Sequence, residues 1–304
     1  MSALSAPHFH DEAAAFAEVE RLLWPEGPVC PHCGSLSGKH YDLRKTRVGL
    51  RKCSDCRKQF TVKVGTVFEC AKIPLNKMLQ AVYLLCASKK GCSSHQIHRT
   101  LGITYKSAWF LTHRIREALR SGDLYPMGGE GEIVEVDETF IGVKEGATKR
   151  RVYAHKHAIL SLVERGGTVR SFHVQGVAAA QLVPILRANI AKETAIMTDE
   201  AGQYGKLGDH FASHDFTVHS AKEYVRGEVH TNTVEDYYSI FKRGMKGVYQ
   251  HCAEKHLHRY VAEFDFRYNH RVALGCGDIE RTETALKGIV GKRLTYRMSH
   301  ETQS

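Results

Sequence analysis

The chain has 304 residues, is 42% hydrophobic and 25% charged, and carries 43 Lys and Arg against 33 Asp and Glu, a formal net charge of +10. This length allows a catalytic domain of ordinary size with one or two small modules, and the basic surplus favours a polyanionic partner. No stretch approaches the roughly twenty apolar residues of a membrane span, and the N-terminus lacks a basic segment followed by an apolar core, so we expect neither a membrane helix nor a secretory signal.

The first predicted element is a short amphipathic helix at residues 11–24. Its apolar residues fall on one stripe of a helix: Phe16, Val19, Leu22 and Leu23. Pro25, Gly27 and Pro28 end it. We therefore assign residues 1–24 to an N-terminal helix that precedes the first module.

Two Cys-x-x-Cys pairs mark the next module, residues 25–70. Cys30 and Cys33 are followed, after nineteen residues, by Cys53 and Cys56. Each pair presents two thiolates to one metal, and two pairs complete a tetrahedron, so the spacing predicts a zinc ribbon with structural Zn²⁺. Short paired strands are expected near residues 41–44, 48–52 and 58–62, with too few apolar residues for an independent core. A redox dithiol pair or chance spacing are the alternatives.

Residues 71–122 are predicted to be mainly helical and to contain a helix-turn-helix. Ser94 is expected to cap a short helix, Gly102 to make the turn, and Thr104 to cap a second helix. The second helix of such a motif enters the DNA major groove. This predicts DNA contacts from Thr104, Tyr105, Lys106 and Ser107, the alternative being an ordinary helical hairpin.

A Gly-rich linker at 121–131 leads into a long α/β region, which we place at residues 123–290, with a tail at 291–304. Three strands, a helix, a strand and further helices predict an α/β arrangement around one mixed sheet. The expected strands are 132–142, 152–163, 168–175 and 195–199, and the expected helices are 178–192, one beginning at 232, and 254–269.

Three acidic residues occupy special places in this region. Asp137 follows an alternating strand pattern, Asp199 ends a short apolar run, and Glu235 opens a helix with thirty-five residues between it and Asp199. Carboxylates at two strand ends and one helix start suit a pair of hard divalent cations, which cut and rejoin phosphodiester bonds by in-line displacement. Strand alternation places Glu135 on the face of Asp137 and turns Glu138 away.

Helix geometry adds two further candidates to this site. Asn232 lies three residues before Glu235 on the same helical face and could ligate a cation through its carbonyl oxygen, so the third ligand is Glu235 or Asn232, with Glu235 preferred. Lys242, seven residues after Glu235, returns to the same stripe about 10 Å along the axis. Lys242 and Arg243 are therefore candidates for contacts with DNA phosphates, as are His219 and His230.

Several segments together carry a resemblance to a known family: 136–142 (VDETFIG), 198–200 (TDE), 220–225 (SAKEYV), 230–235 (HTNTVE), 241–244 (FKRG) and 256–269 (HLHRYVAEFDFRYN). They resemble the DDE transposases of bacterial insertion sequences, most closely the ISXO-like group, over about residues 20–275.

This resemblance implies an RNase H-like catalytic domain behind the zinc ribbon. It also implies that Asp137, Asp199 and Glu235, with Asn232 and Lys242 beside them, use two Mg²⁺ or Mn²⁺ ions. The expected partners are double-stranded transposon ends and target DNA, bound by a homo-oligomer in a bacterial, cytoplasmic, nucleoid-associated setting.

Two other functions remain open at this point. A zinc-ribbon and helix-turn-helix regulator without catalysis would also bind DNA, although the acidic set disfavours it. A metal-dependent nuclease would use the same acids, with water as the nucleophile instead of a 3′-hydroxyl.

Overall fold

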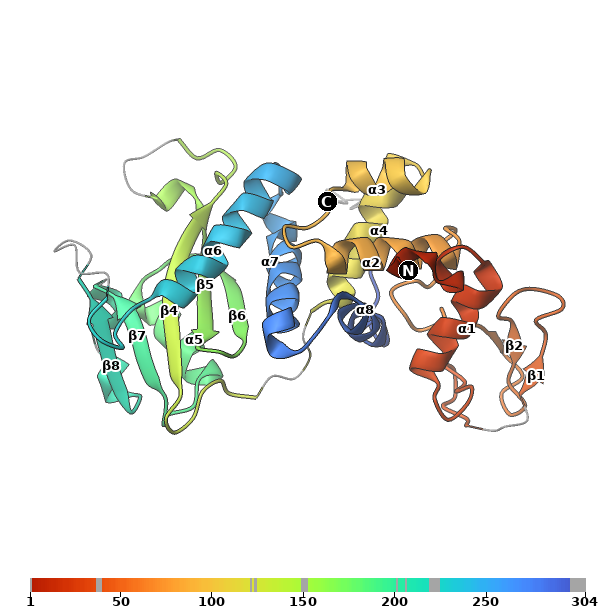
Figure 1. The fold of residues 1–304 in the computed structure, drawn as a ribbon, viewed down its shortest axis with the longest axis horizontal. Helices are drawn as coiled ribbons and strands as arrows, with labels where there is room; N and C mark the ends of the chain where they lie inside the picture. Colours follow the sequence, from red (N-terminus) through yellow and green to blue (C-terminus); the bar gives the residue numbers. More distant parts are fainter. Residues whose placement is uncertain are drawn as a thin grey trace, which may run out of the picture. The chain divides into compact units, whose positions relative to one another are not determined.

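The computed structural model describes residues 2–36, 40–120, 122, 125–148, 153–200, 202–205, 207–218 and 225–295. Their elements, drawn in Figure 1, form two compact units. The described residues of 2–88, 92–120 and 277–295 make the first, and those of 89–91 and 122–276 make the second. The chain thus leaves the second unit at Cys276, earlier than the domain end expected at residue 290. His219 and residues 220–224 of the family-like segment lie outside the described residues.

Five helices build the first unit: α1 (Glu12–Leu23), α2 (Leu75–Ala87), α3 (Ser94–Leu101), α4 (Tyr105–Ala118) and α8 (Asp278–Lys287). The Asp11 carboxylate accepts a hydrogen bond from the Ala14 N–H at 2.7 Å and so starts α1. The sequence did not predict α8. It packs on α2, where the buried Arg281 donates to the Cys86 carbonyl oxygen at 2.9 Å.

The ribbon of this unit is a three-stranded antiparallel sheet in the order β1-β2-β3. Its strands are β1 (Tyr41–Asp42), β2 (Arg51–Lys52) and β3 (Gln59–Phe60), close to the three short strands expected. The apolar interior holds little more than Cys30, Cys53 and Phe60, with Trp24 packed against it. A core this small cannot stabilise a fold alone, which is why the four thiols matter.

The helix-turn-helix is formed by α3 and α4. Gly102 takes the left-handed conformation, with φ of +60°, that lets α3 end and the chain turn. Thr104 caps α4 as predicted, its Oγ1 accepting from the Ser107 N–H at 3.2 Å. The cap of α3 is Ser93, not Ser94. The Ser93 hydroxyl accepts from the Gln96 N–H at 3.2 Å, while the Ser94 hydroxyl lies 3.0 Å from that of Thr112.

A five-stranded mixed sheet is the centre of the second unit. Its strands are β4 (Ile133–Ile141), β5 (His157–Glu164), β6 (Val169–Val174), β7 (Ala195–Asp199) and β8 (Ser213–Thr217). They lie in the order β6-β5-β4-β7-β8. The first three strands pair antiparallel, whereas β7 runs parallel to β4 and β8 parallel to β7. This is the RNase H-like sheet that the resemblance implied, with β8 as a strand that the sequence did not predict.

Helices cover both faces of this sheet. Helix α5 (Ala179–Asn189) packs on one face through Leu182 and Leu186. On the other face, α6 (Asn232–Gly244) lies against β4 and β5, and α7 (Glu254–Asn269) lies against β6 (Figure 1). A π-helical turn, Met245–Tyr249, follows α6 directly. The side chains that alternate along the strands thus form two apolar cores, one on each face of the sheet, and α6 lies across the central strands β4 and β5.

Helix α6 packs so closely within its unit that Gly244 has no space for a side chain. A Cβ built on Gly244 would lie 2.7 Å from the Lys90 carbonyl oxygen and would overlap the Phe264 ring. We therefore expect Gly244→Ala to destabilise the second unit by about 1–3 kcal/mol, because the backbone oxygen cannot yield. Gly247→Ala is the matched control, since its Cβ would meet nothing within 4 Å. Hydrogen exchange of β4 and β5 peptides measures the effect, and equal protection in both variants would contradict the close packing.

Candidate active site

The three predicted acids line one cleft of about 440 Å³ in the second unit. Asp137 and Asp199 come from neighbouring parallel strands, each two residues beyond the last pair in register, Glu135 with Met197. Glu235 comes from the first turn of α6. The residues that line the cleft are Asp137, Asp199, Thr231, Glu235, Tyr238, Ser239 and Lys242. Asn232 is exposed on the same helix, as Glu235 is, but it does not line the cleft, and the choice of Glu235 as the third ligand stays a prediction.

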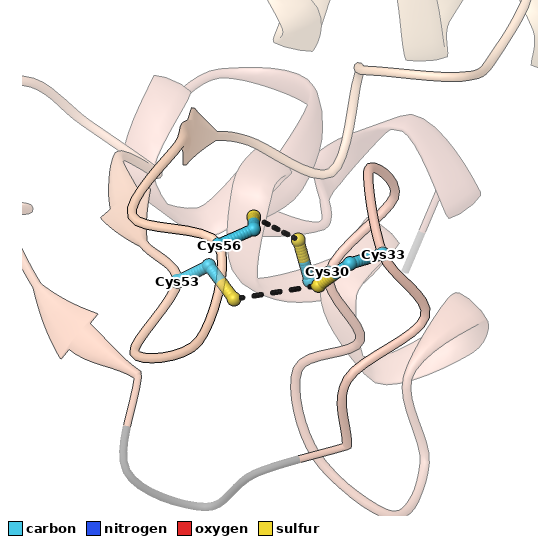
Figure 2. A group of neighbouring side chains, drawn as sticks. All are labelled: Cys30, Cys33, Cys53 and Cys56. Carbon is cyan, nitrogen blue, oxygen red and sulfur yellow. Dashed lines mark hydrogen bonds between the residues drawn. The ribbon is translucent and has the colours of Figure 1, made fainter.

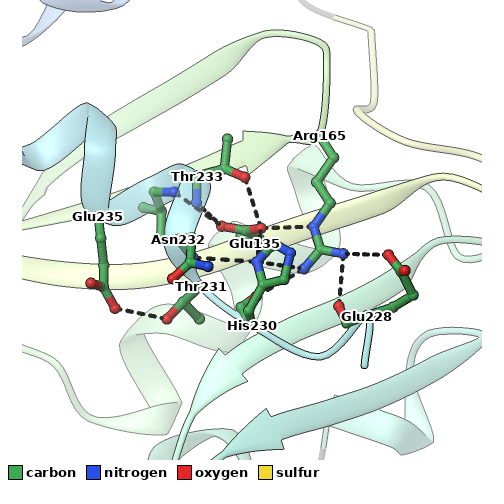
Figure 3. A network of polar contacts seen from close by, with 9 residues as sticks. Glu135, Arg165, Glu228, His230, Thr231, Asn232, Thr233 and Glu235 are labelled. Atoms are coloured by element: carbon green, nitrogen blue, oxygen red, sulfur yellow. Dashed lines mark hydrogen bonds and ion pairs between the residues drawn. The ribbon is translucent and has the colours of Figure 1, made fainter. Parts of the chain in front are cut away.

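A buried carboxylate fixes the start of α6. Glu135 on β4 is completely buried, and its Oε2 accepts from the N–H groups of Thr233 at 2.8 Å and Val234 at 3.0 Å (Figure 3). Thr231, which precedes the helix, makes no capping bond with its side chain. Glu135 therefore satisfies the free amides of the first turn from outside the helix.

Arg165 and His230 complete this network. The Arg165 Nε donates to Glu135 at 2.7 Å, and its guanidinium also reaches the His230 carbonyl oxygen at 2.9 Å and the Glu228 carbonyl oxygen at 2.8 Å. The His230 Nδ1 lies 3.2 Å from the Glu135 carboxylate. His230 thus helps to hold α6 in place, and its expected contact with a DNA phosphate stays a prediction. The network holds the loop before α6 and α6 itself to β4.

Two hydroxyl groups orient the acids. The Tyr238 hydroxyl, buried under α6, donates to the main-chain carbonyl oxygen of Asp137 at 2.6 Å. The Thr231 hydroxyl donates to the Glu235 carboxylate at 3.1 Å (Figure 3). Helix α6 is thereby fastened to the strand position that carries the first acid. These hydrogen bonds relate the positions of Asp137 and Glu235 to each other.

The acids crowd one another electrostatically. Burial, and then the charges of Asp199 and Glu138, raise the pKa of Asp137 to about 8. Burial likewise raises the pKa of Glu138 to about 7, although hydrogen bonds from Tyr204 and Gln203 act against it. Glu138 points to the α5 face as predicted, where Tyr204 lies, but its charge still reaches the cleft. A cation among these groups would relieve the repulsion.

Basic side chains border the acids. Burial lowers the pKa of Lys242, against the opposing attraction of Asp137, and its Nζ lies 5.7 Å from the centre of the Tyr238 ring. The exposed Arg243 donates to the Ser239 hydroxyl, which lines the same cleft. The predicted acids and cations therefore meet on one surface, as an enzyme acting on phosphodiesters requires.

The four predicted cysteines also come together, in the first unit (Figure 2). Cys30 and Cys56 place their sulfurs 3.7 Å apart, as do Cys33 and Cys53, and all four sulfurs lie within 4.8 Å of one another. Burial opposes a charged Cys53 thiolate, but backbone hydrogen bonds from Cys56 and Asp55 lower its pKa to about 6. Four thiols in this arrangement fit a tetrahedral metal ion.

The expected DNA-contact residues begin α4. Thr104, Tyr105 and Lys106 are exposed, whereas Ser107 is partly buried. The Thr104 hydroxyl bonds to Ser107, and the Tyr105 ring stacks on His95 with 4.3 Å between ring centres. The start of the second helix is thus open to a ligand, with Thr104 and Ser107 partly engaged in the cap.

Among the described residues no helix is both long and apolar enough to cross a membrane.

The sequence pattern placed Asp137 at a strand end, but it lies in the middle of β4, whereas Asp199 ends β7 and Glu235 lies in the first turn of α6. The three acids thus converge on one face of an RNase H-like sheet. Residues 129–269 match the ISXO2-like transposase domain, and residues 10–59 match the transposase zinc-ribbon domain. The chain thus matches a transposase zinc-ribbon domain and, after it, an ISXO2-like transposase domain, which confirms the resemblance seen in the sequence.

A relative and a solved structure accompany these matches. The chain is 28% identical over 277 residues to an uncharacterized protein in transposable element ISH50 of Halobacterium salinarum, which covers 85% of this chain and 91% of that protein. A chain of the simian T-cell lymphotropic virus intasome in complex with the PP2A regulatory subunit B56 gamma is 13% identical, with a TM-score of 0.29. The match covers 56% of this chain and 63% of that chain.

Because the acids are crowded, we predict that Asp137→Asn increases the stability of the folded protein, and that the increase depends on pH. Asp137 ionises near pH 4 in the unfolded chain but holds its proton to about pH 8 in the folded one, so the folded state loses stability as the pH rises between these values. The variant lacks this loss. Without added divalent cations, we expect it to be more stable than wild type by about 1–3 kcal/mol near pH 8 and nearly equal near pH 4.

Thermal unfolding across this pH range measures the difference. Asp236→Asn is the matched control, because Asp236 is exposed and lies outside the cleft. An Asp137→Asn protein that is less stable than wild type at pH 8 would contradict the crowding.

Proposed function

We propose that the protein binds the terminal inverted repeats of an insertion sequence, cleaves the ends and joins the 3′-hydroxyl ends to target DNA. The observation that carries this proposal is one cleft lined by Asp137, Asp199, Glu235 and Lys242. A regulator without catalysis has no need of mutually repelling carboxylates beside a lysine. The acids therefore separate the proposal from a purely DNA-binding role.

The three acids fit hard divalent cations by their chemistry. Asp137, Asp199 and Glu235 would hold two Mg²⁺ or Mn²⁺ ions, which when bound neutralise phosphate charge and lower the pKa of attacking water or a 3′-hydroxyl. Lys242 and Arg243 would hold the DNA strand by charge-assisted bonds to its phosphates. Thr231 orients the Glu235 carboxylate from one side, and Tyr238 fixes the backbone of Asp137.

Recognition of the ends is assigned to the first unit. We infer that Thr104, Tyr105, Lys106 and Ser107 at the start of α4 contact DNA, because Thr104, Tyr105 and Lys106 are exposed and a second helix enters the major groove in such motifs. Cys30, Cys33, Cys53 and Cys56 would hold one structural Zn²⁺, which supplies the stability that the small ribbon core lacks. Two ends must be joined together, so we propose that a homo-oligomer acts on the DNA.

Activity assays on single variants test the catalytic assignment. The substrates are duplexes ending in the inverted repeats that flank the encoding gene, incubated with Mg²⁺ and analysed on gels for cleavage and joining. Asp137→Ala, Asp199→Ala and Glu235→Ala should each lose at least about 10³-fold in rate, because a missing carboxylate leaves cation charge uncovered. End binding should stay within about twofold of wild type, since recognition lies in the other unit.

Asn232→Ala is the matched control, one turn before Glu235 and outside the cleft. We expect it to keep cleavage within about tenfold of wild type. An inactive Asn232→Ala beside an active Glu235→Ala would move the third ligand to Asn232. Cleavage without any joining would point to a nuclease instead, and joining by all three acid variants would end the proposal.

Removal of one thiol tests the ribbon. Cys53→Ser should lose one zinc per chain and unfold the ribbon while the second unit stays folded, because each domain has its own core. Cys70→Ser is the control, since Cys70 is exposed and outside the cluster. Elemental analysis gives the zinc content and hydrogen exchange the folding of each unit. An equal zinc content in wild type and Cys53→Ser would contradict the assignment.

A further inference from the structure

A second group of ligating side chains lies on the sheet face that carries Asp137. His157 is the first residue of β5, His173 belongs to β6, and Glu254 is the first residue of α7. Asp137 pairs with Ser161, and Ile141 pairs with His157, so this group is four residues along the sheet from the acidic cleft. Four residues of strand span about 13 Å, which separates the two sites.

The three side chains converge without bonding to one another. The Glu254 Oε1 lies 3.7 Å from the His157 Nδ1 and 3.8 Å from the His173 Nε2, and the two ring centres are 5.5 Å apart. These distances are too long for hydrogen bonds. Both nitrogens are shielded from solvent and have no hydrogen-bond partner, and His157 is only 4% exposed.

Such an arrangement needs a physical reason. A buried polar atom without a partner costs free energy, and two such atoms directed at one carboxylate are unusual in a folded protein. Neutral imidazoles and a carboxylate are the ligands of late first-row divalent ions.

We propose that His157, His173 and Glu254 bind one divalent transition-metal ion, with Zn²⁺ as the representative ligand. Ligand atoms of a tetrahedral zinc site stand about 3.3 Å apart, so the two separations from Glu254 need to shorten by only about 0.5 Å. All three ligand atoms lie within 4.8 Å of one another. Glu254 has 44% of its side chain exposed, which gives the ion a path to the site from solvent. Two nitrogen ligands disfavour Mg²⁺, so this site differs in chemistry from the acidic cleft.

The position of the group indicates what the ion does. Helix α7 is fastened to β6 at two other points, where Asn269 accepts from the Val169 N–H at 2.7 Å and Asp265 accepts from the Ser171 N–H at 2.8 Å. His173 and Glu254 continue this series at the start of the helix. The ion therefore stabilises the second unit by fixing the first turn of α7 to the sheet, independently of the proposed DNA chemistry.

Zinc stoichiometry of the full chain tests the site. After equilibration with a slight excess of Zn²⁺ in the presence of excess Mg²⁺, which occupies the acidic cleft, and removal of the free ions, wild type should hold two zinc ions per chain, one of them on the cysteines. His173→Ala should hold one, and so should Cys53→Ser. The matched control is His251→Ala, an exposed histidine just before α7, which should hold two. X-ray absorption of Cys53→Ser should show nitrogen and oxygen ligands only.

A thermal readout separates lost binding from lost folding. With Mg²⁺ in excess to occupy the acidic cleft, Zn²⁺ should raise the melting temperature of the second unit in wild type and His251→Ala, and should not do so in His173→Ala. If His173→Ala does not fold, Glu254→Gln, at a half-exposed position, takes its place and should hold one ion. One ion per chain in wild type, or two in folded His173→Ala or Glu254→Gln, would overturn the proposal whatever the outcome of the cleavage assays.

Discussion

The hydrogen bonds of one buried carboxylate determine the geometry of the acidic cleft. Glu135 lies on the central strand and satisfies the first amides of α6, while Arg165 balances its charge. Burying an unpaired carboxylate is costly, so this arrangement is stable only with α6 in place. Asp137 is two residues from Glu135 on the same strand face, and Glu235 lies in the helical turn that Glu135 caps. The bonds from the Glu135 carboxylate to α6 therefore help to place both Asp137 and Glu235.

Bringing the carboxylates of the cleft together costs electrostatic free energy. Three acids line it, and a fourth, Glu138, acts on it from the opposite face. Burial first, and then these neighbouring charges, raise the pKa of Asp137 to about 8. Hydrogen bonds from Tyr238 and Thr231 hold the groups in place despite this repulsion. Functional sites of this kind lower the stability of the folded protein. In the second unit, the two apolar cores on the sheet faces offset this loss.

Sequence patterns anticipated the parts of this structure that depend on local periodicity. The alternation in β4 and the apolar run in β7 located Asp137 and Asp199, and the Cys-x-x-Cys pairs located the ribbon. Strand β8 escaped notice because its SHDFT sequence is polar at an edge of the sheet. Helix α8 has few apolar residues and forms by packing on α2, a contact between residues almost two hundred positions apart.

Contacts between residues that are distant in sequence also could not be predicted from the pattern of apolar and polar residues. Strand alternation put Glu135 on the face of Asp137, but its partners Arg165 and Thr233 are distant in sequence, so its capping role could not be inferred. The same holds for His157, His173 and Glu254, which three separate elements bring together. The observed cap of α3, Ser93, lies one residue before the predicted cap, Ser94, because helix boundaries read from a sequence commonly differ by one or two residues from the structure.

The most direct test of the account is to locate divalent ions in the second unit. Anomalous diffraction from crystals equilibrated with Mn²⁺ reports ion positions without reference to DNA or activity. The account predicts Mn²⁺ among Asp137, Asp199 and Glu235 in wild type, and loss of that density in Asp199→Asn. Crystals with no Mn²⁺ in the cleft, or with the same density in Asp199→Asn, would contradict the claim that these three acids form one metal-binding site.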